Sequence, residues 1–329
     1  MKKQSPLLIV LLVALAVALL GGGYLAARAI YKTPLAPPMN LPTATVPAAV
    51  NIAEAVDVAA TSTTAPAVTS TCGQTGSMTI LFLGSDSSVG APPYGADSVR
   101  IIKVDFDARK ITVVSFPRNL IVQTNALNNP IYAQTPLGLT FYYAKLAAPG
   151  TVIERNAAGA RVMAQVMMDN FAVGLTHFVA LQMEQVAVMI DTIGGVEIDI
   201  PTAITSEHNI SFPAGLQTLN GARSTEYVRF LNPGGEAART ARQNNFIKAL
   251  LAKVTNVSIL PLVPTLLSQF KDAIITDLSP EQIVNLVCLA EQMPKENLTF
   301  GGIDIPALVT NNFPNIEAVK AYLTQVFGH

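Results

Sequence analysis

A long uncharged run near the N-terminus divides this chain into a part that can enter a membrane and a part that folds outside it. The run extends from Gln4 to Ala27 and is rich in Leu, Val and Ala. As a helix rising 1.5 Å per residue it would measure about 36 Å, more than the roughly 30 Å hydrocarbon core of a bilayer. The run therefore predicts a transmembrane helix. A cleaved signal peptide is the alternative, because the N-terminus is basic and Ala26, Ala27 and Ala29 are small.

The length of the run favours an uncleaved anchor. Its flanks do not fix the orientation, because Lys2 and Lys3 precede it and Arg28 and Lys32 follow it. The rest of the sequence contains no second spanning run. The simplest topology is single-pass, with residues 1–32 forming a cytoplasmic tip and transmembrane anchor and the remainder exported.

Residues 33–72 have the composition of an extracytoplasmic linker. Pro, Ala, Thr and Val dominate, and Glu54 and Asp57 are the only charges between Thr33 and Ser70. Repeated prolines with little periodicity are typical of an extended tether. Residues 73–329 remain for one globular domain, which is long enough to bury a core.

The chain has two cysteines, Cys72 and Cys288, at the start of this domain and in a late predicted helix. In an exported domain such a pair can form a disulfide. Two unpaired buried thiols are the alternative, and the sequence leaves both open.

Composition argues against nucleic-acid binding. Only 13% of the residues are charged, the formal net charge is −1, and no basic block occurs. The sequence also lacks a nucleophile elbow, a Walker loop and a zinc-type cluster. The histidines are scattered; His177, between apolar neighbours, is expected to pack or cap rather than to catalyse.

Hydrophobic patterning predicts an α/β fold with a central mixed β-sheet flanked by helices. Alternating or compact apolar runs predict strands at 78–83, 98–104, 111–115 and 196–200. Helical spacing occurs at 160–170, 183–190, 237–256, 264–270, 280–292 and 316–327. The sequence Ser279-Pro280 is a good helix start, because serine caps and proline suits the first turn.

Basic residues gather around one glycine-containing turn in the second half of the chain. Arg229 precedes the turn, and Arg239, Arg242 and Gln243 follow it at i, i+3 and i+4 of a predicted helix, which places them on one face. A planar guanidinium binds phosphate oxygens through paired hydrogen bonds. The pattern indicates an anion site, and a solvated helix face with ordinary ion pairs is the alternative.

Two carboxylates and a further arginine are expected at one rim of the sheet. Asp86 follows the first strand, Asp97 begins the second, and Arg118 follows Pro117 at the end of the third. Paired carboxylates suit Mg²⁺, which leaves other coordination positions for water and phosphate. Local turn hydrogen bonds by two loop aspartates are the alternative.

In this order the motifs resemble the LytR-CpsA-Psr family. The resemblance covers roughly Met78 to Val254 and rests on Ile80-Leu-Phe-Leu-Gly-Ser-Asp86, Ala96-Asp97-Ser98, Ser115-Phe-Pro-Arg118, Asp191-Thr-Ile-Gly-Gly-Val196, Leu219-Asn-Gly221, Tyr227-Val-Arg229 and Arg239-Thr-Ala-Arg242-Gln243. It implies that the domain at 73–329 transfers a glycopolymer from a polyprenyl pyrophosphate carrier to the peptidoglycan of a bacterial cell wall, assisted by Mg²⁺. It also implies a single-pass protein of the bacterial cell membrane with its C-terminal domain outside.

The resemblance assigns roles to the residues already singled out. Asp86 and Asp97 match an acidic pair near the metal and diphosphate, and Arg118 matches the arginine of a Ser-x-Pro-Arg-Asp motif. The diphosphate-binding set is matched by Arg229, Arg239, Arg242 and Gln243.

Three positions depart from the family pattern: Asn119 stands where the family usually has Asp, Leu231 replaces the second arginine of an Arg-x-Arg motif, and Glu236 stands where Asp is frequent. The loss at Leu231 removes one cation. Leu231 and Asn119 motivate a rival function, a non-catalytic polyprenyl-phosphate-binding or regulatory protein. A lipid diphosphatase, which releases lipid phosphate to water, is a third alternative.

The expected reaction is a phosphotransfer. A sugar hydroxyl of the acceptor attacks the sugar-proximal phosphorus, and polyprenyl phosphate leaves. Such a reaction needs alignment and charge neutralisation more than covalent help from the protein. Either Asp86 or Asp97 is a candidate to orient or deprotonate the hydroxyl. The lipid tail calls for an apolar tunnel.

Overall fold

A computed structural model of the chain describes residues 30–39, 41, 72–85, 95–255, 265, 268–270 and 273–328. The predicted anchor, most of the predicted linker and most of the helix expected at 264–270 lie outside these residues. Within the described part of the chain, no helix is both long and apolar enough to cross a bilayer. The transmembrane helix therefore stays a prediction.

The described residues form a central six-stranded mixed sheet in the order β11-β6-β1-β2-β3-β12. Strands β1, β2 and β3 are antiparallel neighbours, whereas β6 runs parallel to β1 and β12 runs parallel to β3. The bounds are β1 Ser77–Ser85, β2 Ala96–Asp105, β3 Lys110–Phe116, β6 His177–Gln182, β11 Ile274–Thr276 and β12 Leu298–Gly302. The three strands predicted from the first apolar runs are confirmed, and they belong to one sheet as expected.

The helices begin where the sequence supplies caps. At Ser279 the hydroxyl accepts from the Gln282 N–H and the Gln282 side chain accepts from the Ser279 N–H, which confirms the predicted helix start. Thr151 and Glu154 form the same reciprocal cap on another helix. The bounds are α2 Leu137–Ala147, α3 Val152–Phe171, α4 Met183–Thr192, α5 Gly221–Arg229, α6 Gly235–Val254, α8 Pro280–Gln292 and α9 Ile316–Phe327.

Short elements complete the described fold. Paired short strands are β4 Ile121–Gln123 with β5 Gln134–Pro136, β8 Ile204–Thr205 with β9 Ser211–Phe212, and β13 Val309–Thr310 with β14 Phe313–Pro314. The 3₁₀ helices are η1 Asn125–Leu127, η2 Pro130–Tyr132 and η4 Lys295–Asn297.

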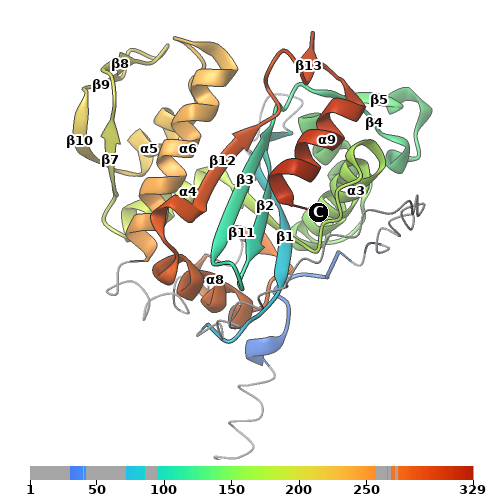
Figure 1. Cartoon of the computed structure of the whole chain (residues 1–329), viewed down its shortest axis with the longest axis horizontal. Coiled ribbons are helices and arrows are strands. Elements are labelled where there is room, and N and C mark those ends of the chain that lie inside the picture. Colours follow the sequence, from blue (N-terminus) through green and yellow to red (C-terminus); the bar gives the residue numbers. More distant parts are fainter. Residues whose placement is uncertain are drawn as a thin grey trace, which may run out of the picture.

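The two faces of the sheet pack against different layers (Figure 1). Side chains alternate between the faces along each strand. The core face packs against α2, α3 and α9, and its strand residues include Leu81, Leu83, Val99, Ile101 and Val114. The pocket face is covered by α8 at one end and by α4, α5 and α6 at the other, and its strand residues include Ile80, Phe82, Arg100, Ile102 and Val113.

A second, smaller core lies beyond α6, at the left of Figure 1. Strands β7 (Val196–Ile200) and β10 (Gly215–Leu219) pair with each other and not with the central sheet. Gly194 and Gly195 lead from α4 into β7 with φ of 78° and 84°, values that favour glycine. The stacked rings of Phe212 and Phe230 lie in this core. It anchors the helices that carry the predicted arginines.

The start of the predicted linker is packed onto the domain. The Leu35 N–H donates to the Leu278 carbonyl, and the Met39 N–H donates to the Asp277 carboxylate at 3.1 Å. Ala36 and Met39 are buried in the core-face cluster. An extended tether was expected here from composition; burial of two apolar side chains and the buried Asp277 acceptor hold this part against the fold instead.

The cysteines form a disulfide that joins Cys72 to Cys288 of α8. Of the two alternatives left by the sequence, the bonded pair is the correct one. His177 is packed as expected, with its ring nitrogens next to Thr176 and Gln282. Burial lowers the pKa of His177, and the charge of Asp277 opposes this shift.

Candidate functional site

The site begins where β2 and β3 meet at one end of the sheet. Asp97 lies near the start of β2, and Arg118 follows β3 after Pro117. The backbone of Arg118 is held by α2, because its carbonyl accepts from the Gly138 N–H at 2.7 Å. Gly95 lies so close to this helix that a Cβ there would be 2.1 Å from the Gly138 oxygen. Close backbone packing therefore fixes both sides of the Asp97 and Arg118 pair.

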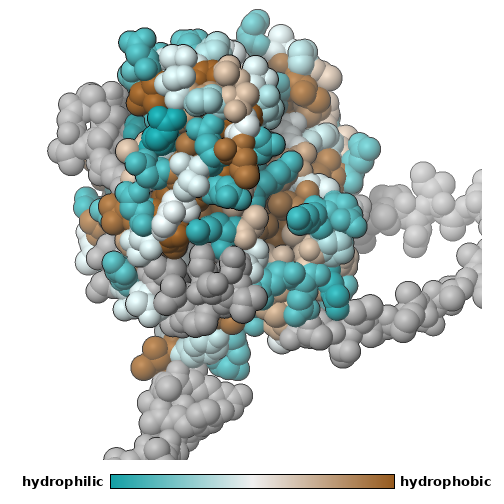
Figure 2. Space-filling model, turned by 90° about the vertical axis from the view of Figure 1, so that its left-hand side faces the viewer, coloured by the Kyte–Doolittle hydropathy of each residue, from teal (hydrophilic) through white to brown (hydrophobic). Residues whose placement is uncertain are grey.

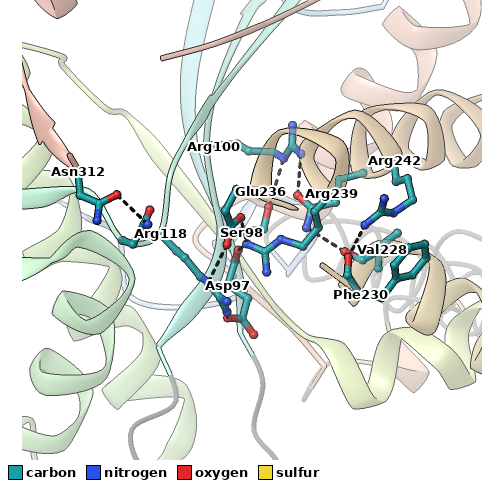
Figure 3. Close-up of polar contacts among 12 residues, drawn as sticks. Asp97, Ser98, Arg100, Arg118, Val228, Phe230, Glu236, Arg239, Arg242 and Asn312 are labelled. Atoms are coloured by element: carbon teal, nitrogen blue, oxygen red, sulfur yellow. Dashed lines mark hydrogen bonds and ion pairs between the residues drawn. The ribbon is translucent and has the colours of Figure 1, made fainter. Parts of the chain in front are cut away.

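Four charged side chains form one network at this point (Figure 3). The Arg118 Nη1 donates to Asp97 Oδ1 in a close ion pair, and Arg118 Nε lies 3.4 Å from Glu236 Oε1. The other oxygen of Glu236 accepts from Arg239 Nη2 at 2.6 Å. Glu236 thus joins the arginine from the sheet to the arginine from α6. Two acids and two guanidiniums balance each other here.

Arg239 is the most buried cation of this network, with 5% of its surface exposed. Its Nη2 also lies 3.3 Å from the Asp97 carbonyl oxygen, while its buried Nε has no hydrogen-bond partner in the described structure. Burial lowers the pKa of Arg239, and the charge of Glu236 opposes this effect. A buried donor without an acceptor costs free energy, and a ligand oxygen would recover it.

Gln243 and Arg100 connect α6 to β2 behind the network. Arg100 Nη2 donates to Gln243 Oε1 at 2.9 Å, and Gln243 Nε2 donates to the Val228 carbonyl at 3.1 Å. Both ends of the amide are therefore engaged. Sequence reasoning predicted Gln243 but missed Arg100, which lies among apolar residues at 99–102 and outside the motifs that carry the resemblance.

Arg229 and Arg242 occupy different positions, although both were predicted to bind diphosphate. Arg229 lies at the end of α5 and lines the polar pocket described below. Arg242 instead donates to the carbonyls of Tyr227 and Phe230, and its guanidinium lies 3.6 Å from the centre of the Phe230 ring. It does not line that pocket. In the described structure Arg242 braces the backbone that carries Arg229, and its direct role with diphosphate stays a prediction.

Two motifs of the resemblance position α5. The Asp191 carboxylate, at the end of α4, accepts from the Gly221 N–H at 2.8 Å. The Asn220 side chain caps the same helix by accepting from the Arg223 N–H. Gly221 lies against the backbone of Ala187, where a Cβ would be 2.0 Å from the carbonyl oxygen. These residues set where Arg229 lies rather than meeting a ligand.

The charged residues line a polar pocket of about 520 Å³. An apolar pocket of about 210 Å³ adjoins it, between the pocket face of the sheet and helices α4, α5 and α6. Gly84, Ser98, Val228 and Gln243 line both. The polar pocket is lined further by Asp97, Arg118, Arg229, Leu231 and Arg239, and the apolar one by Phe82, Ile102, Leu181, Val186, Phe246 and Leu250.

The surface around this part of the molecule is mixed. Figure 2 shows the side formed by β7, β10 and α6, where hydrophilic residues alternate with apolar ones over the described surface. Beside the arginines, the apolar lining is that of the internal pocket.

The described residues alone do not form a complete metal site, so a metal ion would need additional ligands from a substrate. The described residues contain no group of three or more His, Cys, Asp or Glu side chains placed to hold an ion. Asp97 supplies one carboxylate, which pairs with Arg118, and Asp86 lies outside the described residues. Mg²⁺ is usually held by one or two carboxylates together with substrate phosphates. The residues present fit that mode and not an all-protein cage.

The departures from the family pattern lie at different distances from the pocket. Leu231 lines the polar pocket, so the arginine that it replaces in the family pattern is absent from the site itself. The exposed Asn119 is turned away and donates to Asn312 Oδ1 at 2.8 Å. Glu236 provides the carboxylate that joins Arg118 to Arg239. Leu231 therefore changes the pocket, Asn119 lies outside it, and Glu236 keeps a carboxylate at its position.

A further pair at the pocket rim was missed from the sequence. His208, in the turn between β8 and β9, has its Nδ1 at 3.0 Å from Glu226 Oε1, and both residues line the polar pocket. A single histidine in a loop gives no sequence signal of a partner 18 residues later. The fold of the small core brings them together.

Comparison with known proteins agrees with this geometry. A family model described as the LytR_cpsA_psr family matches residues 44–326. The cell wall biosynthesis protein LcpA of Corynebacterium glutamicum is 25% identical over 228 residues, covering 64% of this chain and 43% of LcpA. The Bacillus subtilis protein named polyisoprenyl-teichoic acid–peptidoglycan teichoic acid transferase TagU is 31% identical over 122 residues, covering 35% of this chain and 40% of TagU. The chain thus spans less than half the length of these relatives.

Solved structures share the fold at lower identity. The crystal structure of B. subtilis TagV aligns with a TM-score of 0.60 and 17% identity, over 78% of this chain and 99% of TagV. A structure described as TagT bound to LIIa-WTA aligns with a TM-score of 0.56 and 14% identity, over 77% of this chain and 92% of that one. The expected central mixed sheet flanked by helices is confirmed by these neighbours.

Proposed function

This chain belongs to the LytR-CpsA-Psr family, and on that premise we propose that it is a phosphotransferase that attaches a glycopolymer from a polyprenyl pyrophosphate carrier to peptidoglycan. The observation that carries the proposal is the polar pocket that continues into an apolar one. An amphiphilic donor has the matching parts, a diphosphate head and an isoprenoid tail. Arginines at the polar end suit the head, and aliphatic and aromatic side chains suit the first part of the tail.

The proposed head-group site consists of Arg118, Arg229 and Arg239, with Gln243 behind them. In the described structure Asp97 and Glu236 neutralise two of these arginines. A bound diphosphate would take over hydrogen bonds that the two acids now accept. Because Arg239 Nε is buried without an acceptor, one donor is already available for that exchange. The network is thus arranged for a ligand of negative charge.

The proposed reaction is an in-line transfer. An acceptor sugar oxygen forms a bond to the sugar-proximal phosphorus, the bond from that phosphorus to the bridging oxygen breaks, and polyprenyl phosphate leaves. The hydroxyl proton passes to a base, for which Asp97 and Asp86 are the candidates. Arg118 and Arg239 would stabilise the negative charge that develops on the leaving phosphate.

Mg²⁺ is the proposed cofactor, held by Asp97 and Asp86 together with the diphosphate. It would supply charge neutralisation at the phosphate oxygens. The contribution of the chain itself is the alignment of the donor. The Gly138 contact fixes Arg118, and the caps at Asn220 and Gly221 fix the helix that bears Arg229.

An exported location is also proposed, with the chain anchored by residues 4–27 in the bacterial cell membrane. The Cys72–Cys288 disulfide supports it, because disulfides persist outside the reducing cytoplasm. With such an anchor, the packing of residues 35–39 onto the domain would keep the domain close to the membrane and within reach of a lipid-linked donor.

A transfer assay tests the function. The exported domain, begun at residue 30, is incubated with a synthetic prenyl-diphosphate glycan, Mg²⁺ and a peptidoglycan fragment. We expect glycan on the peptidoglycan fragment and release of prenyl phosphate in equal amount. Tight donor binding without turnover would favour the binding or regulatory protein, and prenyl phosphate released without an acceptor would favour the diphosphatase. Either result contradicts the transferase.

A further inference from the structure

Arg100 is the largest fully buried side chain in the described structure, with 1% of its surface exposed. It points from the pocket face of β2, opposite Phe82 of β1 and Ser115 of β3. A guanidinium is among the most costly groups to remove from water. Its burial next to the apolar residues Val99, Ile101 and Ile102 therefore needs a compensating role.

The hydrogen-bond partners of Arg100 are all neutral. Its Nε donates to Ser98 Oγ at 3.2 Å, its Nη1 to Asn244 Oδ1 at 2.5 Å and its Nη2 to Gln243 Oε1 at 2.9 Å. No ion pair joins Arg100 to a carboxylate among the described residues. The geometry satisfies the donors of the guanidinium and leaves its charge without a direct counterion.

The electrostatic surroundings agree with this picture. Burial and, to a smaller extent, the nearby Arg239 lower the pKa of Arg100 to about 10, and the charge of Asp304 opposes the shift. The side chain therefore stays protonated at neutral pH. Two buried cations, Arg100 and Arg239, repel each other across a region of low dielectric, and an anion placed between them would stabilise both.

Arg100 lies beside the junction of the two pockets, because it donates to Ser98 and Gln243, which line both. It lines the apolar pocket, and it also lines a small cavity of about 20 Å³ together with Asp97, Arg118, Glu236 and Arg239. Gln243, whose carbonyl oxygen faces Arg100, lines both of these and the polar pocket. Arg100 thus lies where a phosphate head would pass into an apolar tail.

We propose that Arg100 is a positioning residue for the diphosphate of the donor, which orients the Gln243 amide and supplies positive potential beneath the lipid-proximal phosphate. The inference rests on the proposed function. Arg100 acts from behind the pocket wall, since its own donors are taken by Ser98, Gln243 and Asn244. Asp304 lines the same small cavity and its charge favours the protonated Arg100, but it forms no ion pair with Arg100 in the described structure, so the diphosphate provides the direct counterion.

The proposal separates ligand binding from stability. Replacing a buried charge by an apolar side chain of similar volume is often neutral or stabilising for a fold. We expect Arg100→Met to bind inorganic pyrophosphate at least about tenfold more weakly in calorimetry, equal to about 1.4 kcal/mol, with an unchanged or raised Tm. The loss should shrink as salt screens the charge. Lys110→Met, which removes an exposed charge from β3, is the matched control and should leave the Kd unchanged.

If Arg100→Met does not fold, a second variant still tests the proposal. Asn244→Asp has the same shape and gives Arg100 the carboxylate that it lacks. We expect it to fold, to match or exceed the wild-type Tm, and to weaken pyrophosphate binding. Arg100→Lys should retain part of the affinity, because it keeps the charge and loses the planar set of donors.

Three results would decide against the proposal. Wild-type affinity in Asn244→Asp would overturn it, as would an Arg100→Met variant that binds normally with a lowered Tm, since Arg100 would then serve the fold alone. A wild-type domain without measurable affinity for pyrophosphate or geranyl pyrophosphate would overturn the proposed function and this inference together.

Discussion

Arg100 and Ile101 are neighbours in β2, both are almost fully buried, and they lie on opposite faces of the same sheet. Ile101 packs into the core face among the side chains of α2, α3 and α9. Arg100 lies on the pocket face, among polar groups and beside two cavities. Equal burial therefore has two meanings in this fold. On the core face, burial of an apolar side chain stabilises the domain. On the pocket face, we propose that the buried positive charge of Arg100 stabilises a bound anion.

The same division holds for the whole sheet. The core face carries aliphatic and aromatic residues from β1, β2, β3 and β6, and it is covered by α2, α3 and α9 and by Ala36 and Met39. The pocket face carries an apolar cluster at the α8 end and the lining of the apolar pocket. At the other end it meets α6 through Arg100, Gln243 and Arg239. The stability of the domain thus depends mainly on the side chains of the core face, and the proposed chemistry depends on those of the pocket face.

The largest expected effect is on the core face. Ile101→Ala should lower the free energy of unfolding by about 2–5 kcal/mol, because it removes buried methyl groups and leaves a cavity. Urea denaturation measures the loss. Pyrophosphate affinity of the folded fraction should not change. Ile101→Val, the matched control, should cost only about 0.5–1.5 kcal/mol. If the folded Ile101→Ala domain no longer bound pyrophosphate, the core face would also contribute to binding, and the proposed division between the two faces would be wrong.

The opposite pattern is expected for Arg239 on the pocket face. Arg239→Ala should reduce the transfer rate by about 10²–10³-fold, the typical cost of losing one preorganised donor to a developing oxyanion. Its Tm should change little, because Glu236 can still pair with Arg118. Arg155→Ala, an exposed arginine of α3, provides the control and should transfer at the wild-type rate. Normal transfer by Arg239→Ala would remove this residue from the site.

A smaller gain is expected from restoring the missing cation. Leu231→Arg places a guanidinium in the polar pocket, and we expect pyrophosphate to bind several-fold more tightly, about 0.5–1.5 kcal/mol for one added hydrogen bond. Leu216→Arg, at an exposed position of β10, adds the same charge outside the pocket and should have no effect. Equal gains in both variants would show a general effect of net charge.

The smallest effect is expected at Asn119. Its side chain contacts Asn312 and lines neither pocket, so Asn119→Ala should change the transfer rate less than about twofold, as for most surface positions. A change in the steady-state rate of tenfold or more would mean that this departure from the family pattern belongs to the site after all.

Much of the fold could be predicted because its signals are local. Alternation marked β1, β2 and β3, and the Ser279 cap fixed the first residue of α8. The packed part of the linker could not be predicted, since Pro- and Ala-rich composition carries no information about the distant Asp277 acceptor of Met39.

Spacing along one helix predicted that Arg239, Arg242 and Gln243 project from the same face of α6. In the structure Arg239 and Gln243 both line the polar pocket, and their role as ligand-binding residues stays a prediction. The same spacing included Arg242, which the aromatic ring of Phe230 draws away. Arg100 was missed because a buried cation within Val99–Ile102 contradicts the strand's own pattern, and a functional reason for it is visible only in three dimensions.

The central claim is that one ligand fills both pockets, with its diphosphate at the arginines and its tail on the pocket face. Calorimetry with inorganic pyrophosphate, geranyl pyrophosphate and longer prenyl pyrophosphates in Mg²⁺ tests it most directly. We expect the geranyl compound to bind at least about tenfold more tightly than pyrophosphate, since each buried methylene contributes about 0.8 kcal/mol, with a plateau once the pocket of about 210 Å³ is full. Equal affinity for pyrophosphate and all of the prenyl compounds would contradict the claim.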